Sequence, residues 1–299
     1  MFRIRSRRGP VFYQNLWGFA FAVPALILLL IFSIYPLLNA LYFSTTSWGL
    51  GDKPTFIGLD NYIKLATVDV VFWQSLKTTT LYAIGLNPLL WALSLALALI
   101  FNRSFKFRGI FRTIFFTPVI VSWVVAAIVW STILQPSFGL NAQVMRIFGQ
   151  PGFSLFDNSS TALPTIILMV LWKDVGYFMV LFLAGLQNIP GVYYEAAAID
   201  GASQWQQFRH ITFPLLKPTT LFVVIISIIQ SFQAFTPIWL TTAGGPAGAT
   251  RVLPILIYQN AFRFYGKIGY ASAMAFFLFV VLMIITLIQM RLFRVDPDN

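Results

Sequence analysis

The chain has 299 residues, of which 58% are hydrophobic and only 10% carry a charged side chain. Soluble globular domains contain about 25% charged residues, so this composition excludes them and indicates an integral helical membrane protein. The net charge of +11 does not indicate nucleic-acid binding, because the basic residues gather in short loops beside apolar stretches, as in membrane proteins. Cysteine is absent from the sequence, which excludes disulfides and thiolate metal sites.

Six apolar stretches are long enough to span a bilayer, for which a helix needs about 20 residues. Prolines in or beside these stretches are compatible with spans, because neighbouring helices can satisfy the freed backbone groups. The predicted spans lie, in chain order, near residues 16–42, 76–101, 111–134, 162–186, 217–240 and 269–291. The prediction is therefore an all-α integral membrane protein with one transmembrane domain over residues 1–299.

The basic residues are divided unequally between the two sides of the predicted bundle. Twelve lie on the side that holds both termini and seven on the other, while Lys173 lies inside a span. Basic loops remain in the cytoplasm, so both termini are predicted to be cytoplasmic. The N-terminal arginines and the apolar run after them resemble a signal peptide, but the run is too long for a signal core and no A-x-A site follows it. The first span is therefore expected to stay in the protein.

The segment 187–217, on the predicted cytoplasmic side, carries signals for two short helices. Pro190 suits the first turn of the first helix, and Gly201 suits the position just past its end. Three residues between them are spaced to form one narrow apolar stripe: Val192, Ala196 and Ile199. The segment is thus expected to begin with a helix that ends at a glycine hinge.

A second helix is predicted after the hinge. Ser203 and Gln206 form an S-x-x-Q capping box at its start, and Pro214 is expected to break it before the next span. The segment is about 30 residues long, whereas a simple connection between helices takes about 2–8 residues. A loop that merely joins two spans is the alternative, but the helix signals favour a docking surface for a cytoplasmic partner.

Three short motifs in this segment resemble the EAA loop of permease subunits in binding-protein-dependent ABC importers: Glu195-Ala196-Ala197, Asp200-Gly201-Ala202 and Ile211-x-Phe213-Pro214. That family usually has leucine at the position of Phe213, which is a mild departure. Residues 111–118, 183–190 and 240–246 are similar to the carbohydrate branch of the family, which includes maltose, multiple-sugar and glycerol-phosphate permeases. The resemblance extends over nearly the whole chain.

The resemblance implies six transmembrane helices in the inner (plasma) membrane and a defined set of partners. A second, similar permease, two ATPase subunits and an extracytoplasmic solute-binding protein would complete an importer for a carbohydrate. The sequence has no G-x-x-x-x-G-K-[ST] motif, so ATP and Mg²⁺ are expected on the ATPase, with no enzyme activity or cofactor on this chain. The loop would transmit the motion of the ATPase through Glu195, Ala196, Ala197, Asp200, Gly201, Phe213 and Pro214.

Polar residues inside apolar spans are candidates for the solute pathway, because they are costly in a membrane and tend to be functional. Lys173, Asp174 and Tyr177 lie in the fourth predicted span, where an ion pair with another helix is an equal alternative. In the fifth span, amide and hydroxyl groups lie beside aromatic rings, which suits a neutral sugar, although such polar groups also join helices. The candidates there are Gln230, Ser231, Gln233, Phe235 and Trp239, with further ones in other spans at Asn87, Ser122 and Trp123.

His210 is the only histidine, so no histidine-based metal site is expected. Glycerol phosphate or another polar solute is the main alternative substrate, but no arginine lies well inside the predicted spans to bind a phosphate. An ion-coupled secondary transporter would depend on Asp174 and would leave the segment 187–217 unexplained. A membrane-bound enzyme would need converging titratable groups, which the spans do not provide.

Overall fold

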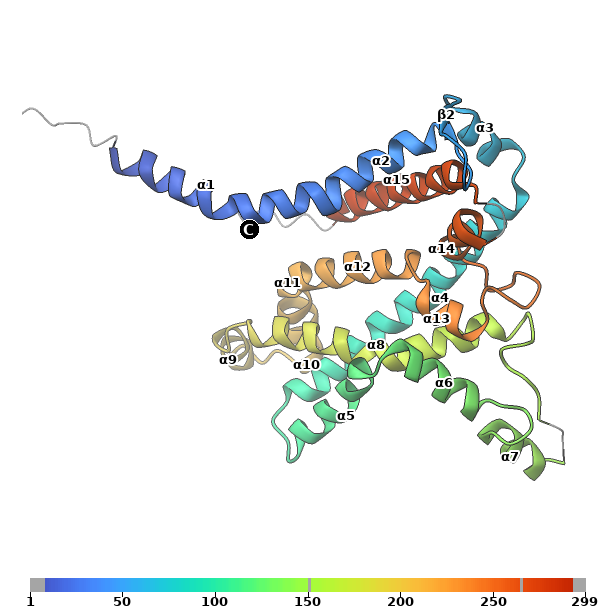
Figure 1. Ribbon diagram of the computed structural model, residues 1–299. Coiled ribbons are helices and arrows are strands. Elements are labelled where there is room, and N and C mark those ends of the chain that lie inside the picture. Colours follow the sequence, from blue (N-terminus) through green and yellow to red (C-terminus); the bar gives the residue numbers. More distant parts are fainter. Residues whose placement is uncertain (1–8, 150–151, 264–265, 293–299) are drawn as a thin grey trace, which may run out of the picture. The chain divides into compact units, whose positions relative to one another are not determined.

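The computed structural model describes residues 9–149, 152–263 and 266–292, and nearly all regular structure in these ranges is helical (Figure 1). The described residues form two compact units. The first lies within Met1–Ala66 and Asn260–Phe276, and the second within Thr67–Gln259 and Phe277–Asn299. Some of the basic residues that support the predicted orientation lie outside the described ranges: Arg3, Arg5, Arg7, Arg8 and Arg294.

The first unit contains a long apolar helical segment followed by a short hairpin. Its elements are α1 (Gly9–Leu29), a π-helical turn (Leu30–Ile34), α2 (Tyr35–Ser44), β1 (Thr46–Ser47), β2 (Thr55–Phe56), α3 (Asp60–Thr67) and the first turns of α15 (Ile268–Leu292). The two strands pair antiparallel. The Asn61 side chain donates hydrogen bonds of 2.9 Å to the carbonyls of Ser44 and Thr46. It therefore ties the start of α3 to the end of α2.

The second unit contains long helices and several short or interrupted ones. The long helices are α4 (Val70–Asn102), α8 (Ala162–Gln187) and α12 (Lys217–Phe232). The shorter elements are α5 (Arg108–Ile120), α6 (Trp123–Ile133), α7 (Leu140–Ile147), α9 (Val192–Ile199), α10 (Gln204–Gln207), a π-helical segment (Phe208–Thr212), α11 (Phe213–Leu215), α13 (Thr236–Thr241) and α14 (Leu253–Tyr258). A π-helical turn (Gln259–Arg263) follows α14 and belongs, from Asn260 on, to the first unit.

Helix α8 forms the centre of the second unit. Ile166, Phe178, Met179 and Phe182 are fully buried along it, as expected for a helix that is hydrophobic on all sides. Helices α4, α5 and α12 all pack against α8. Gly176 lies so close to the backbone of α5 that a β-carbon would collide with a carbonyl oxygen there. A small residue at this position lets the two helix backbones approach each other.

Four helical segments agree in position with predicted spans and are long and apolar enough to cross a membrane: Phe21–Ser44, Val70–Asn102, Ala162–Gln187 and Ile268–Leu292. The helices near the other two predicted spans are bent. If each bent pair is counted as one span, the described residues provide up to six spans. The helical class of the fold is therefore as predicted, while two spans differ from the expected continuous helix.

The predicted span 111–134 is divided between α5 and α6, whose axes differ by 99°. Val121 has an extended backbone, and the Ser122 hydroxyl accepts a hydrogen bond from the N–H of Val125 at 3.3 Å. Ser122 is thus the N-cap of a new helix, and serine is among the residues preferred at that position. The chain turns sharply between the two helices, as Figure 1 shows.

The predicted span 217–240 is also interrupted, because α12 ends at Phe232 and α13 begins at Thr236. Pro237 lies in the first turn of α13. Its ring nitrogen has no hydrogen to donate to the carbonyl of Gln233, four residues earlier, so a continuous helix would lose a hydrogen bond there. The break places irregular backbone between two helical segments inside an apolar stretch.

Candidate functional site

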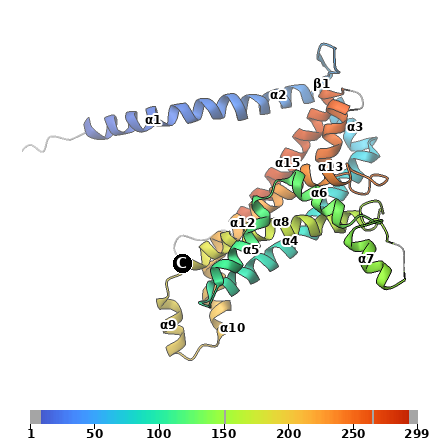
Figure 2. The same cartoon turned by 60° about the horizontal axis from the view of Figure 1, so that its bottom comes forward.

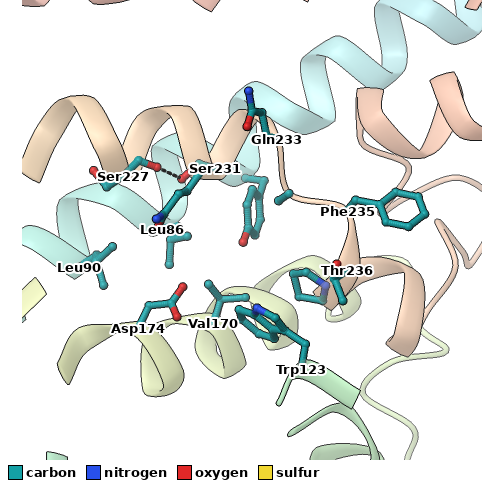
Figure 3. A pocket seen from close by; sticks show the side chains of 14 residues that line it. Leu86, Leu90, Trp123, Val170, Asp174, Ser227, Ser231, Gln233, Phe235 and Thr236 are labelled. Carbon is teal, nitrogen blue, oxygen red and sulfur yellow. Dashed lines mark hydrogen bonds between the residues drawn. The ribbon is translucent and has the colours of Figure 1, made fainter. Parts of the chain in front are cut away.

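A cavity of about 360 Å³ lies inside the second unit, where the two interrupted helices meet α4 and α8. Side chains of α8 and α6 line one side of it, and side chains of α12 line the opposite side (Figure 3). Six of the residues predicted for the solute pathway line this cavity: Trp123, Asp174, Gln230, Ser231, Gln233 and Phe235. The fold thus brings together residues from three of the predicted spans.

The lining combines hydrogen-bonding groups with apolar and aromatic surface. Gln230, Gln233 and Thr236 are exposed, and the Asp174 carboxylate points into the space (Figure 3). The Ser231 hydroxyl is already engaged, because it donates to the carbonyl of Ser227 at 2.7 Å. This arrangement can offer amide donors and acceptors and one carboxylate to a polar solute.

Five other predicted pathway residues do not line the cavity. The Asn87 side chain bonds to the Ser231 hydroxyl at 2.8 Å, which joins α4 to α12. Ser122 caps α6, and the ring of Tyr177 packs edge-on against Phe178. Trp239 stacks on Phe235, with ring centres 5.5 Å apart.

The fifth, Lys173, is buried, with 4% of its surface exposed. Its Nζ donates to the carbonyl oxygens of Pro118, Val119 and Val121 at 3.1, 3.0 and 2.7 Å. The lysine therefore faces the end of α5, while its neighbour Asp174 faces the cavity. This divergence follows from the turn of about 100° between successive residues of a helix.

Several lining residues did not stand out in the sequence: Tyr82, Leu86, Leu90, Val170, Ser227, Ala234, Thr236 and Pro237. Ser227 precedes Ser231 by one helical turn, so the spacing of the polar residues could have indicated it. The apolar members carry no local signal, because apolar residues are ordinary in a span. Among the described residues, no group of three His, Asp or Glu side chains could hold a metal ion.

The EAA-like segment forms the two predicted helices at one end of the second unit (Figure 2). The first helix, α9, ends in a Schellman motif: the N–H of Gly201 bonds to the carbonyl of Ala198 at 3.1 Å, and that of Ala202 bonds to Ala197 at 2.9 Å. Gly201 has φ of +75°, a conformation that favours glycine. The predicted end of the first helix at Gly201 is confirmed. The helix begins at Val192 rather than at Pro190, which lies just before it.

The second helix begins at the predicted capping box. The Ser203 N–H bonds to Oε1 of Gln206 at 2.7 Å, and the Gln206 N–H bonds to the Ser203 hydroxyl at 3.4 Å. The prediction that Pro214 breaks this helix is wrong, because helical structure continues through α11. A bend of 65° instead occurs at Leu216. Pro218 follows closely and cannot donate a hydrogen bond to the carbonyl four residues earlier.

Most of the surface of this segment is exposed. Val192 and Ile199, in the predicted apolar stripe, are 61% and 88% exposed, and no residue of α9 is buried. Glu195 and Asp200 are also exposed. Large exposed apolar side chains at the tip of a helical unit are typical of a surface that another protein covers.

Comparison with known proteins identifies the class. The family described as "Binding-protein-dependent transport system inner membrane component" matches residues 89–294. The chain belongs to this family, and it is therefore a multi-pass permease of the plasma membrane and not an enzyme. Coupling to an ATPase through the EAA loop is typical of the family.

Several curated relatives cover nearly the same length. The chain is 39% identical over 281 residues to a probable ABC transporter permease, YesP, of Bacillus subtilis, covering 93% of this chain and 90% of the relative. It is 33% identical to the lactose transport permease LacF of Rhizobium radiobacter, covering 95% and 96%. It is also 33% identical to the trehalose/maltose transport permease MalF of Thermococcus litoralis, covering 94% and 95%.

Solved structures agree in fold. A bacterial ABC transporter involved in the import of the acidic polysaccharide alginate matches with a TM-score of 0.81 and 25% identity, over 94% of this chain and 96% of that one. The alginate transporter in complex with its pentasaccharide-bound periplasmic protein matches with a TM-score of 0.83 and 23% identity, over 97% and 98%.

Proposed function

We propose that this chain forms half of the translocation pathway of an ATP-driven sugar importer. In this proposal residues 1–299 form one permease domain with six spans and both termini in the cytoplasm. The observation that carries it is the pair of capped, exposed helices in the EAA-like segment, at one end of the unit that holds a polar cavity. The family membership and the two bent helix pairs support it.

The proposed partners are a second, similar permease, two ATPase subunits and an extracytoplasmic solute-binding protein. ATP and Mg²⁺ would bind to the ATPase. The exposed α9 and the residues after it would dock there and carry its motion to α12. The coupling residues in this proposal are Glu195, Ala196, Ala197, Asp200, Gly201, Phe213 and Pro214. The exposure of Glu195 and Asp200 and the hydrogen-bonded Schellman end of α9 support that role.

The cavity favours a neutral sugar as the solute. Sugar hydroxyls can donate to the Asp174 carboxylate and exchange hydrogen bonds with Gln230 and Gln233, while Trp123 offers a face to the C–H groups of a sugar ring. Glycerol phosphate fits less well, because the described residues that line the cavity include no Lys or Arg and an anion would meet a carboxylate. The names of the lactose and trehalose/maltose relatives support a neutral sugar.

Reconstitution tests this proposal. The chain is co-expressed with a second permease and an ATPase, extracted in mild detergent and assayed for ATP-dependent sugar uptake in vesicles with the binding protein. We expect Gly201→Asp and Glu195→Ala to abolish uptake and leave the affinity of the binding protein for sugar unchanged. Gly149→Asp is the matched control, because Gly149 also has a positive φ, of +68°, with open space around it. Uptake that persists without ATP would instead point to a secondary transporter.

A further inference from the structure

Lys173 is the centre of an unusual cluster of backbone carbonyls. A lysine ammonium has three N–H groups and no acceptor, and Nζ here has three carbonyl partners within 3.1 Å, those of Pro118, Val119 and Val121. All three donors are therefore occupied. Lys173 has no donor left for the solute or for Asp174.

The three carbonyls lie at the end of α5 and in the turn after it. The last carbonyls of a helix have no partner within the helix and form the negative end of its dipole. In a membrane no water is available to satisfy them. The Pro118 carbonyl also accepts a hydrogen bond from the Val121 N–H at 3.3 Å. Lys173, which comes from α8, adds a hydrogen bond to each of the three carbonyls and brings a positive charge to this point. It therefore stabilises the place where α5 stops and the chain turns by 99° into α6.

The same lysine lies next to a side chain of the cavity. Its Nζ is 4.9 Å from the centre of the Trp123 ring, close enough for a cation–π contact. Trp123 is the first residue of α6 and lines the cavity. In Figure 3 its ring lies on the same side of the space as Val170 and Asp174. The position of the indole thus depends on where the corner between α5 and α6 is held.

We infer that Lys173 is a positioning residue that fixes the corner between α5 and α6 and so holds the Trp123 ring against the sugar in the cavity. Asp174, on the neighbouring face of α8, contacts the solute directly, so the two adjacent residues have separate roles. This inference rests on the proposed function in one respect, namely that the cavity receives a sugar. The placement of Trp123 by Lys173 does not depend on which solute the cavity receives.

Cysteine labelling tests the placement. The natural chain has no cysteine, so Trp123→Cys introduces the single thiol of this subunit. The rate at which this thiol reacts with a small, water-soluble methanethiosulfonate is measured in the assembled transporter. The Trp123→Cys variant is compared with variants that also carry Lys173→Gln or Lys173→Met. We expect the rate to change about tenfold when the lysine is lost and to return toward the original with Lys173→Arg, which keeps a cation and several donors.

Two controls make the labelling specific. Thr236→Cys reports on α13, where Thr236 lines the cavity, and its labelling should not change with Lys173→Gln. Lys77→Met removes an exposed lysine of α4 and should leave the labelling of Trp123→Cys unchanged. Unaltered labelling of Trp123→Cys in an assembled Lys173→Gln transporter would overturn the inference.

Uptake kinetics test the functional half. We expect Lys173→Gln to raise the sugar concentration for half-maximal uptake about tenfold, equivalent to about 1.4 kcal/mol, because the Trp123 ring is no longer held against the sugar, while basal ATP hydrolysis changes little. If the lysine variants do not assemble, a second measurement uses Trp123→Cys with the native lysine present and asks whether the sugar protects the thiol from labelling. A sugar that reaches this surface should slow the labelling of Trp123→Cys, and the absence of protection during active uptake would contradict the role of Trp123. A transporter that imports no sugar would refute the proposed function. The labelling rate of Trp123→Cys would still test whether Lys173 fixes the corner between α5 and α6.

Discussion

The hydroxyl of Tyr194 lies 2.9 Å from the hydroxyl of Thr212 and forms a hydrogen bond between α9 and the π-helical segment that leads toward α12. No residue of α9 is buried, so apolar packing against the rest of the unit contributes little to holding this helix in place. This bond connects the helix that would meet the ATPase with the chain that enters the membrane. It is therefore a point at which force would pass from one to the other.

Removing this hydrogen bond should weaken coupling. In Tyr194→Phe we expect the number of sugars taken up per ATP hydrolysed to fall several-fold, because a bond of about 1 kcal/mol no longer holds α9 to its neighbour. Thr212→Val should act in the same direction, and the double variant should be no worse than either single one. Tyr193→Phe is the control, since Tyr193 is half exposed beside it. An unchanged uptake-to-hydrolysis ratio in both single variants would refute the link.

Gly176→Ala should destabilise the second unit. A methyl group at this position would collide with the backbone of Phe115, and overpacking of this kind costs about 1–3 kcal/mol. The expected result is a lower midpoint of thermal unfolding in detergent and a lower yield of assembled transporter. Gly109→Ala in α5 is the control, because a β-carbon there meets nothing within 4 Å. Equal midpoints for the two variants would show that α5 can shift away from α8 without cost.

Thr79→Val should also reduce stability, through a backbone group far away in the sequence. The Thr79 hydroxyl accepts a hydrogen bond of 2.8 Å from the N–H of Leu253 at the start of α14. Valine would leave that buried N–H without a partner, at a cost of about 1–3 kcal/mol. Thr79→Ser should restore most of the loss. Thr80→Val is a matched control, because the Thr80 hydroxyl donates to the carbonyl of Leu76 in its own helix. The thermal midpoints of the purified variants provide the measurement.

Asp174→Asn should change the choice of solute. The carboxylate faces the cavity (Figure 3), where in the proposed function it would accept hydrogen bonds from sugar hydroxyls and repel an anion. We expect the apparent affinity for a neutral sugar to fall by about tenfold, the loss of one charge-assisted hydrogen bond, and competition by an acidic saccharide to increase. Competition assays in vesicles measure both effects. Identical competition profiles for the variant and the natural protein would exclude contact between Asp174 and the solute.

Local features of the sequence were enough to predict part of this molecule. Four spans follow from runs of apolar residues, because crossing a bilayer requires a length and a composition that can be read without a fold. The end of α9 at Gly201 and the capping box of Ser203 and Gln206 also follow from neighbouring residues. Helix caps involve groups only a few residues apart, so short patterns identify them.

The cavity was predicted only in part. Six of its residues were candidates because polar and aromatic groups stand out within apolar spans, but Tyr82, Val170 and Thr236 looked ordinary. The bend after α5 and the break before α13 carry weak local signals in Ser122 and Pro237. Both signals also occur in continuous helices, since serine and proline are tolerated inside membrane spans.

The roles of Lys173 and Asp174 separate what the sequence determines from what the tertiary structure decides. The sequence determines that the two residues lie on one helix and point about 100° apart. It does not determine which of them faces a cavity, because the partners of Lys173 are carbonyls 52 to 55 residues away. Backbone carbonyls are present at every residue and leave no trace in the sequence. Only the packing of α5 against α8 brings those three carbonyls to the lysine and leaves the carboxylate facing the cavity.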